Sequence, residues 1–491
     1  MSVAKQIRKR KYRSPLFFRY LAYVLLFVSI VCLFVLFRMD IIPTKYYIVI
    51  CVVVVPLVLL LMKILLNRGK LKRVVASLIS FVLIIGMILI SFYGNNTINF
   101  LQNNLGIMNS YKIHNYQVLV LNNSSYKDID DIENKKIGTL ENVNNEDEGL
   151  KEAIKKINKK IKVKYEEKDD AITLVNSLLD SDVDAILIEE SQLALVTEED
   201  NTITNKIRKI YSFEIRIKEE NTTNDIDITK KPFNIYISGI DTYGSIQSVS
   251  RSDVNMVVSI NPNTHNILLI SIPRDYYVSL HGISSYKDKL THAGMYGIDK
   301  SVQTIEDLLD TDINYYVKIN FTSLIKIVDA LGGVSVESES AFISKDGFKY
   351  TKGINYLNGE KALSFARERK AFADGDRRRG RDQQALLTAL INKVTTPKII
   401  VKYNSLLKSL DGSFVTNMSE NNITKFIKMQ INDNIKWNIT SINLDGTNGM
   451  EYTYSYKSGK LYVMIPDLES VNSAKQSIKY NLNPPKENKK K

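Results

Sequence analysis

Three long apolar runs without a single charge lie near the start of the chain and limit what it can fold into. They cover Tyr20 to Phe37, Tyr46 to Met62 and Val74 to Tyr93, which are 18, 17 and 20 residues long. Each is close to the roughly 20 residues that a helix needs to cross about 30 Å of hydrocarbon. A cleaved signal peptide is a poor alternative, because the first run is long for that role and two more follow it. The sequence therefore predicts three transmembrane helices in a membrane anchor over residues 1–95.

The lysines and arginines beside these runs predict an orientation, because cytoplasmic flanks carry an excess of positive charge. Seven basic residues precede the first run, and the loop "NRGKLKR" between the second and third runs has four. The loop "RMDIIPTK" between the first two runs has only two, against one aspartate. We therefore expect a multi-pass protein of the cell membrane with a cytoplasmic N-terminus and a large extracellular part after Tyr93.

The net charge of +13 belongs to this anchor. Residues 1–95 hold 14 of the 66 basic residues and one of the 53 acidic residues, which leaves 52 of each in residues 96–491. The basic flanks suit anionic lipid of the inner leaflet, whereas the exported part is neutral overall. The high pI is therefore no argument for nucleic acid, which we exclude as a partner.

Cysteine and histidine usage narrows the chemistry further. The two cysteines, Cys32 and Cys51, both fall within predicted spans. The exported part can then have neither a disulfide framework nor a cysteine-based metal site. The four histidines are scattered without the paired spacing of a zinc site.

The exported part is predicted to be α/β and to contain two domains. After an Asn-rich spacer at residues 96–113, residues 114–218 alternate between strand patterns such as "YQVLVL" and helix patterns such as "DEGLKEAIKKINKK". This small accessory domain has no glycine-rich phosphate loop, so a spacer, a protein-binding domain and a ligand-binding domain all remain open. A polar linker at residues 219–230 follows it.

The larger domain is predicted over residues 231–470. The segments "FNIYISGID", "VNMVVSI" and "NILLISI" read as strands with nearly continuous apolar character, which indicates a central sheet covered on both faces. Residues 471–491 are expected to form a disordered basic tail. Helices are expected at about Asp299 to Leu309, at Phe321 to Leu331, from Gly359 through "EKALSFARER", and in "ALLTALINKV" after Gln384.

Four polar clusters follow the apolar elements of this domain: "GID" at 239–241, "RSD" at 251–253, "IPRD" at 272–275 and "RERKAFADGDRRRGRDQQ" at 367–384. Loops at strand ends are where α/β folds place ligands, so the clusters could converge. Each is weak by itself. An aspartate after a strand is usually a turn former, and a basic run is usually a solvated face or a nucleic-acid patch.

In this order and spacing, the four clusters resemble the LytR-CpsA-Psr family of membrane-anchored phosphotransferases. The resemblance covers about residues 231–466, and the three-span anchor with an accessory domain is similar to the streptococcal-type capsule-biosynthesis branch. Many members carry an arginine directly before the paired glutamines. This chain has Asp382 there, with arginines at Arg379 and Arg381, so the role of Arg381 is left open.

The residue types suit a pyrophosphate diester, because planar guanidinium groups bind phosphoryl oxygens in pairs. Arg367 and Arg369 are two positions apart, which on a helix separates them by about 200°. We therefore expect a helix to end between them, so that both can contact one ligand. Arg377 and Arg378 are assigned no ligand contact and are expected to tolerate substitution.

The resemblance implies transfer of a phosphate-linked glycan, either capsular polysaccharide or a similar wall polymer, from polyprenyl pyrophosphate to peptidoglycan. It implies Mg²⁺ (or Mn²⁺) held by Asp241 and Asp253, since Mg²⁺ is bound by carboxylates together with substrate phosphates. Catalytic roles are expected for Asp253, Arg274 and Asp275, with either aspartate as the candidate base. The expected pyrophosphate-binding residues are Arg251, Arg274, Arg367, Arg369, Arg379, Arg381 and Gln383.

The expected partners are the polyprenyl-linked glycan, peptidoglycan, membrane lipid and other capsule-export proteins. Two alternatives belong to other classes of protein. A non-enzymatic regulator of capsule synthesis or expression would not depend on Asp241 or Arg274. A solute sensor acting through the accessory domain would lose its function without residues 114–218 and would tolerate changes to the arginines.

The predicted topology can be tested on intact cells stripped of their wall. Protease added from outside should degrade the region after residue 95 and spare the N-terminal tail, because only the former is exported in this orientation. Fragments are followed with tags at the two ends of the chain. Survival of the large domain under these conditions would contradict the orientation.

Overall fold

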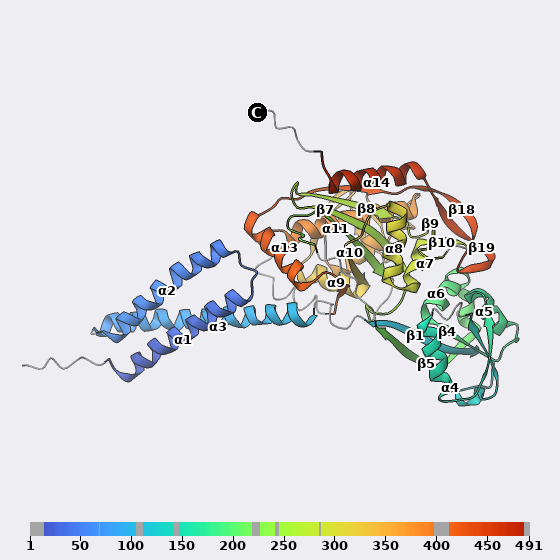
Figure 1. The fold of residues 1–491 in the computed structure, drawn as a ribbon, viewed down its shortest axis with the longest axis horizontal. Helices are drawn as coiled ribbons and strands as arrows, with labels where there is room; N and C mark the ends of the chain where they lie inside the picture. Colours follow the sequence, from blue (N-terminus) through green and yellow to red (C-terminus); the bar gives the residue numbers. More distant parts are fainter. Residues whose placement is uncertain are drawn as a thin grey trace, which may run out of the picture. The chain divides into compact units, whose positions relative to one another are not determined.

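The computed structural model describes residues 14–67, 69–104, 111–141, 147–218, 226–240, 245–283, 286–396 and 412–485. It consists of two compact units, the first formed by residues 1–104 and 420–435 and the second by residues 105–419 and 436–491 (Figure 1). The candidate site lies entirely in the second unit.

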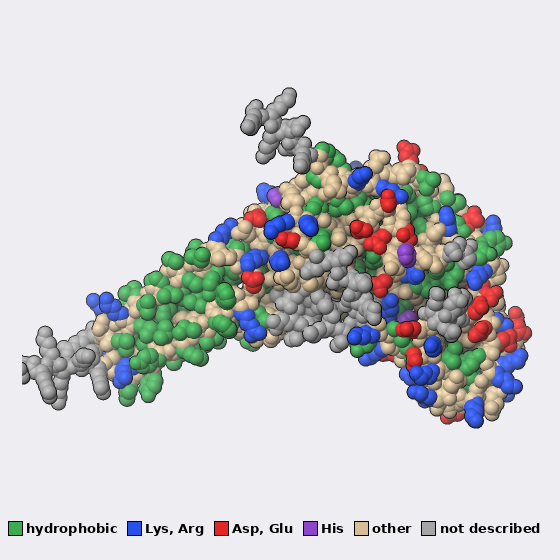
Figure 2. All heavy atoms as spheres, in the orientation of Figure 1, with side chains coloured by type: hydrophobic (Ala, Val, Ile, Leu, Met, Phe, Trp, Pro, Cys, Tyr) green, Lys and Arg blue, Asp and Glu red, His purple; other side chains and the backbone are tan. Residues whose placement is uncertain are grey.

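The first unit contains three apolar helices, α1 (Leu16–Arg38), α2 (Thr44–Leu66) and α3 (Lys70–Asn104), together with α13 (Glu420–Asp433). All three of the former are long and apolar enough to cross a membrane. Their side chains are mostly apolar and outward-facing, as the green surface in Figure 2 shows. An outward apolar surface suits lipid, so the predicted membrane anchor is confirmed as three helices.

The predicted spacer at 96–113 is wrong in most of its length. Helix α3 continues to Asn104, and the first strand begins at Tyr111. Thr97 and Ile98 are buried in this continuation of the helix, and the Thr97 hydroxyl donates to the Tyr93 carbonyl oxygen at 3.0 Å. Asn-rich composition therefore did not end the helix.

The accessory domain is a five-stranded sheet in the order β3-β2-β4-β1-β5 with helices packed against it. Its limits, Tyr111 to Lys218, match the predicted 114–218 closely. Its elements are β1 (Tyr111–Leu121), β2 (Lys136–Leu140), α4 (Glu148–Asn158), β3 (Lys164–Lys168), α5 (Ala171–Leu179), β4 (Ala185–Glu189), α6 (Glu190–Glu199) and β5 (Ile207–Lys218).

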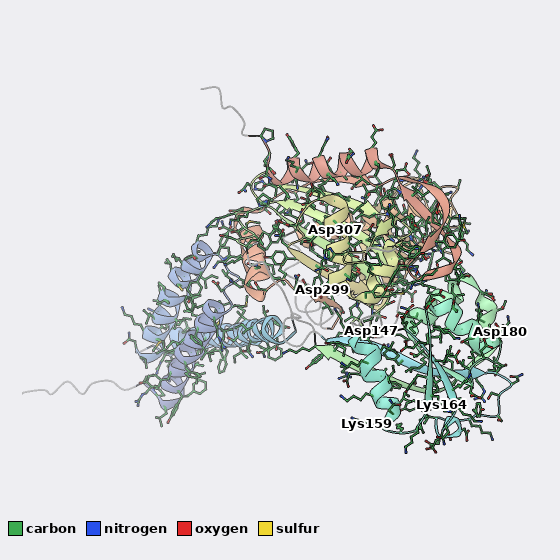
Figure 3. The ribbon with its side chains drawn as sticks, turned by 45° about the vertical axis from the view of Figure 1, so that its right-hand side comes forward. Asp147, Lys159, Lys164, Asp180, Asp299 and Asp307 are labelled. Carbon is green, nitrogen blue, oxygen red and sulfur yellow. The ribbon has the colours of Figure 1, made fainter. Side chains whose placement is uncertain are left out.

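Two helices of this domain begin at capping aspartates. The Asp147 carboxylate accepts from the Leu150 amide at 2.9 Å, and Asp170 accepts from the Thr173 amide at 2.7 Å. Figure 3 shows Asp147 at the start of α4 and Lys159 at its end, which is the arrangement that the helix dipole favours. Helix α6 was not predicted, because it follows β4 without a break and its apolar residues are few.

The larger domain is built on a six-stranded mixed sheet in the order β16-β11-β6-β7-β8-β17. Strands β7 and β8 form an antiparallel hairpin, and β11 and β17 pair in parallel with β6 and β8. The strands are β6 (Phe233–Ile240), β7 (Ser252–Asn261), β8 (Asn266–Ile272), β11 (Tyr315–Asn320), β16 (Phe414–Thr416) and β17 (Asn438–Asn443).

Helices cover this sheet. Helices α8 (Ile298–Leu309) and α14 (Leu468–Leu482) share a buried core with Tyr236 and Val257 of the sheet. Helix α11 (Gly375–Val394) lies against β8 and β17, where the Gln384 amide donates to the carbonyl oxygens of Leu269 and Ile442 at 3.3 and 2.7 Å. The predicted α/β class with a covered central sheet is confirmed.

Smaller elements complete the domain. They are β9 (Tyr277–Ser279), β10 (Lys287–Lys289), α7 (Leu290–Ala293), α9 (Phe321–Ala330), β12 (Val334–Ser338), β13 (Phe342–Ile343), β14 (Lys349–Tyr350), β15 (Gly353–Leu357), α10 (Gly359–Arg367), β18 (Gly446–Thr453) and β19 (Tyr456–Pro466).

Two predictions for this domain need correction. The tail at 471–491 was expected to be disordered, but α14 runs to Leu482 and buries Val471, Ala474 and Ile478 in the core. Residues 486–491 lie outside the described residues. Helix α11 begins at Gly375, well before Gln384, so the arginine cluster is itself helical. The sequence did not predict the first two turns of this helix, because they are mostly charged and apolar residues at helical spacing begin only after them.

Candidate anion-binding site

Strand register brings two of the polar clusters together. In the β7–β8 hairpin Asn255 lies opposite Ile272, so continuing the register by two residues sets Asp253 opposite Arg274. The Nη1 atom of Arg274 donates to Oδ1 of Asp253 at 3.0 Å, and the Thr291 hydroxyl donates to the same oxygen at 3.3 Å. The "RSD" and "IPRD" clusters thus meet at one end of the hairpin.

Helix α11 adds the third cluster by approaching the same strand ends closely. A Cβ atom at Gly380 would lie 2.9 Å from the Ser271 hydroxyl oxygen, so a side chain there would push the helix away from β8. Arg379 and Gln383 are four positions apart on α11 and therefore face the same side. Both line a pocket together with Asp253 and Arg274.

The pocket draws its residues from four segments of the chain. Asp253 comes from β7, the next group from the end of β8, and most of the remainder from the first turns of α11 and the end of β17. The lining residues are Asp253, Ser271, Ile272, Pro273, Arg274, Asp376, Arg377, Arg379, Gly380, Gln383, Asn443 and Leu444.

Ion pairs between arginines and aspartates set the pKa values in this pocket. Burial by itself would raise the pKa of Asp253, but the positive charges of Arg274, Arg379 and Arg251 outweigh it and hold that pKa below its usual range. Burial lowers the pKa of Arg379, which Asp376 partly offsets. Burial acts likewise on Arg274, but Asp253 and Asp275 more than compensate and raise its pKa. Asp253 is therefore ionised at neutral pH.

Arg274 has donor capacity left for a ligand. Its Nε atom is buried and makes no hydrogen bond to any described residue, with the nearest paired oxygen, Oδ2 of Asp275, 3.6 Å away. Asp275 also lies 3.7 Å from Nζ of Lys289. A buried guanidinium N–H without a partner costs stability, and an anion in the pocket would relieve that cost.

The structure places the other predicted residues at varying distances from the pocket. Helix α10 ends at Arg367, as expected, with the Arg367 guanidinium 4.0 Å from the centre of the Phe321 ring. Arg369 is exposed but close enough for its charge to lower the pKa of Arg379. Gln383 donates to the Ala366 carbonyl oxygen at 3.1 Å. Asp241 lies outside the described residues.

Arg381 is not brought to the pocket. It lies two positions beyond Arg379 on α11, which turns it to another side of the helix. There it pairs with Glu339 at 2.9 Å and Asp374 at 2.7 Å. The geometry therefore gives no support for its expected contact with pyrophosphate.

Arg377 and Arg378 have different surroundings, and their expected tolerance of substitution stays a prediction. Arg377 lines the pocket and pairs with Asp445 at 2.7 Å. Arg378 is buried against the Phe372 ring and donates to Asp382 at 2.9 Å. Burial raises the pKa of Asp382 to about 6, against the pull of Arg378. Asp382 thus orients Arg378 from one turn further along the same helix, and Arg378 in turn donates to the Ser338 and Ser340 hydroxyls outside α11.

One residue of the site was missed entirely. Glu198, at the end of α6 in the accessory domain, accepts from Nη2 of Arg274 at 2.7 Å and also pairs with Nη1 of Arg251. Sequence reasoning had no signal for it, because α6 was not predicted and an acidic residue in another domain has no motif.

Of the two aspartates expected to bind a metal ion, only Asp253 belongs to the described residues. These residues contain no group of three His, Cys, Asp or Glu that could hold an ion. Asp253 has the ionised carboxylate that Mg²⁺ needs, but three guanidinium groups surround it and repel a cation. A cation would therefore fit here together with phosphate oxygens, which supply the missing negative charge.

Fold and site together define an α/β domain, carried by a chain with three membrane-span helices, that presents an arginine-lined anion pocket at its strand ends. The chain belongs to the LytR_cpsA_psr family, which matches residues 199–472.

Part of the chain is also similar to named proteins and to a solved structure. The polyisoprenyl-teichoic acid–peptidoglycan teichoic acid transferase TagU of Bacillus subtilis is 34% identical over 208 residues, which are 42% of this chain and 67% of TagU. TagU of Bacillus mycoides is 32% identical over 266 residues, 54% of this chain and 82% of its own. The crystal structure of B. subtilis TagV aligns with 52% of this chain and 98% of its own, at 28% identity and a TM-score of 0.43.

Arg378 and Arg377 allow a stability test of the helix that carries the site. Arg378→Ala should cost about 3–5 kcal/mol, because it leaves the Asp382 carboxylate buried without its partner. The loss should be smaller at pH 5 than at pH 8, since a carboxyl with a raised pKa is protonated at the lower pH and no longer buries a charge. Thermal unfolding of the full-length protein in detergent measures both.

Arg377→Ala is the matched control, because its pair with Asp445 is largely exposed and such pairs contribute about 0–1 kcal/mol. Equal losses for the two variants, or a loss at Arg378 that does not depend on pH, would contradict the structural role of the Arg378–Asp382 pair.

Proposed function

We propose that this protein is a membrane-anchored phosphotransferase that moves a phosphate-linked glycan from polyprenyl pyrophosphate to peptidoglycan. The glycan is capsular polysaccharide or a similar wall polymer, and the catalytic domain faces outward while the N-terminus is cytoplasmic. The observation that carries the proposal is the convergence of Arg251, Arg274 and Arg379 on Asp253 from three segments of the chain. Membership of a family whose relatives include named teichoic acid transferases supports it.

The reaction needs no nucleotide, because the pyrophosphate bond of the carrier already stores the energy. A hydroxyl oxygen of the wall attacks the phosphorus next to the glycan and forms a new P–O bond. The bond from that phosphorus to the bridging oxygen breaks, and polyprenyl phosphate leaves with the bridging oxygen and the electron pair. The hydroxyl proton passes to a base. The products are a glycan–wall phosphodiester and polyprenyl phosphate.

In this scheme the arginines bind the diphosphate and stabilise the transition state. Guanidinium groups bind phosphoryl oxygens in pairs and stabilise the charge that develops on them during transfer. Arg274 is the best placed, because it is buried and has a free Nε–H, and Arg379 lines the same pocket. Gln383 adds an amide on the same side of α11 as Arg379. Arg367 and Arg369, at the end of α10, would contact the carrier further out.

The two aspartates beside Arg274 play different parts in the proposal. Asp253 is ionised, but its lowered pKa makes it a weak proton acceptor, and its hydrogen bond suits it to orienting Arg274. Asp275, between Arg274 and Lys289, is the other candidate for the base.

We extend the proposal to a divalent cation, Mg²⁺ or Mn²⁺, with Asp253 and Asp241 as its protein ligands. When bound, such an ion offsets negative charge on the phosphoryl groups. Because of the surrounding guanidinium groups, Asp253 should hold the ion only when the diphosphate is also present. Membrane lipid and other capsule-export proteins are the further partners that we propose.

A pair of lysine substitutions on one helix tests the arginine roles. Arg379→Lys should lower transfer about 100-fold, because lysine keeps the charge but loses the paired donors. Arg381→Lys is the control on the same helix and should stay within about twofold, since Arg381 faces Glu339 and Asp374. The measurement is release of polyprenyl phosphate from a lipid-linked oligosaccharide in the presence of peptidoglycan.

A solvated basic face would respond to total charge and not to position, so lysine at either place would have no effect. That result, or a larger loss at Arg381 than at Arg379, would overturn the proposed roles.

The metal proposal has its own test. Asp253→Asn should reduce transfer strongly and weaken its dependence on added Mg²⁺, and it should also lower the thermal midpoint, because Arg274 then stays buried without its charged partner. Direct Mn²⁺ binding, followed by electron paramagnetic resonance, should be detectable with pyrophosphate present and weak without it. Full transfer by the wild-type protein in excess chelator would remove the metal from the mechanism.

A further inference from the structure

The accessory domain contributes a carboxylate to the anion site. Glu198 is the penultimate residue of α6, and its two oxygens contact two different arginines of the pocket region. Oε1 accepts from Nη2 of Arg274 at 2.7 Å, and Oε2 pairs with Nη1 of Arg251. One carboxylate thus bridges two of the guanidinium groups that the proposed function assigns to phosphate.

Further contacts between the two domains hold α6 beside the pocket in this conformation. Strand β1 of the accessory domain pairs with the segment just before Arg251: the Ile113 amide donates to Gln247 at 3.2 Å, and the Val249 amide donates to Ile113 at 2.9 Å. Met295 of the larger domain belongs to the same buried cluster as Leu195 and Val196 of α6.

Charge pairs reinforce this docking. Lys112 lies 3.5 Å from Asp299, which Figure 3 labels at the start of α8. Lys289, beside Asp275, lies 3.9 Å from Glu199, the residue after Glu198. The contact of Glu198 with the arginines is therefore part of a built interface and not the chance reach of one surface side chain.

The bridging carboxylate uses the donors that a phosphate would use. Carboxylate and phosphate oxygens both accept paired hydrogen bonds from guanidinium groups, and with similar geometry. Of the five N–H donors of Arg274, one on Nη1 goes to Asp253 and one on Nη2 goes to Glu198, so Glu198 takes a donor that a ligand could use. A diphosphate placed at these arginines would also stand beside the Glu198 charge and be repelled by it.

We propose that Glu198 occupies a phosphate position of the site and competes with the diphosphate of the lipid carrier. The inference rests on the proposed function and adds a means of regulation. The accessory domain keeps the diphosphate out of the site until α6 moves away. When the open state is a minor population, the apparent affinity for the ligand falls by the same fraction. An accessory domain that appeared to be a spacer or a ligand-binding module thus becomes a regulator of access.

The experiment measures binding of inorganic pyrophosphate to the full-length protein in detergent by titration calorimetry. Glu198→Gln should bind pyrophosphate about tenfold tighter than the wild type, because the competing charge is gone. Glu198→Asp keeps the charge but shortens its reach, and it too should bind more tightly. Glu190→Gln, at the other end of α6, is the matched control and should behave as the wild type does.

A carboxylate that only positions Arg251 and Arg274 would give the reverse result. Unchanged or weaker binding in both Glu198 variants would overturn the inference. Arg274→Ala separates this failure from that of the proposed function: if the wild type binds pyrophosphate no better than Arg274→Ala does, the arginine site itself is refuted. Thermal midpoints of all variants show that each one is folded.

Discussion

The ion pair between Arg274 and Asp253 is the interaction on which the rest of the site depends. Both side chains are largely buried, where neither charge would be stable alone. Their pairing keeps Asp253 ionised and Arg274 charged, and Arg251 and Arg379 gather around the same carboxylate. The arginines are held by protein carboxylates: Asp253, Asp376 and Glu198. The protein's own ion pairs therefore organise the site.

The fold delivers this arrangement through backbone geometry. The β7–β8 register sets Asp253 opposite Arg274, and the missing side chain of Gly380 lets α11 come close enough to bring Arg379 to the same strand ends. On the far side of α11, the hydrogen bond from Arg378 to Ser338 of β12 and the pair of Arg381 with Glu339 hold the helix in position. Two neighbouring arginines of one cluster thus have different roles, because Arg379 faces the ligand pocket and Arg378 faces the core.

Sequence reasoning reached much of this because the strongest patterns were local. Apolar runs predicted the three membrane helices, and nearly continuous apolar strands predicted the covered sheet with polar clusters at its ends. Two helices were not predicted. Residues Gly375 to Gln384 of α11 have too many charged residues to show an apolar period, and α14 has only a weak amphipathic pattern. The inward or outward direction of Arg378 and Arg381 depends on helix phase, and the contact of Glu198 depends on domain docking. Neither can be read from composition.

The most direct test of the account is a structure of the full-length protein with a polyprenyl pyrophosphate-linked oligosaccharide bound. The account predicts the diphosphate within hydrogen-bonding distance of Arg274 and Arg379, and Glu198 withdrawn from Nη2 of Arg274. A diphosphate bound away from these arginines, with the Glu198 contacts intact, would contradict both the assignment of the pocket and the role given to the accessory domain.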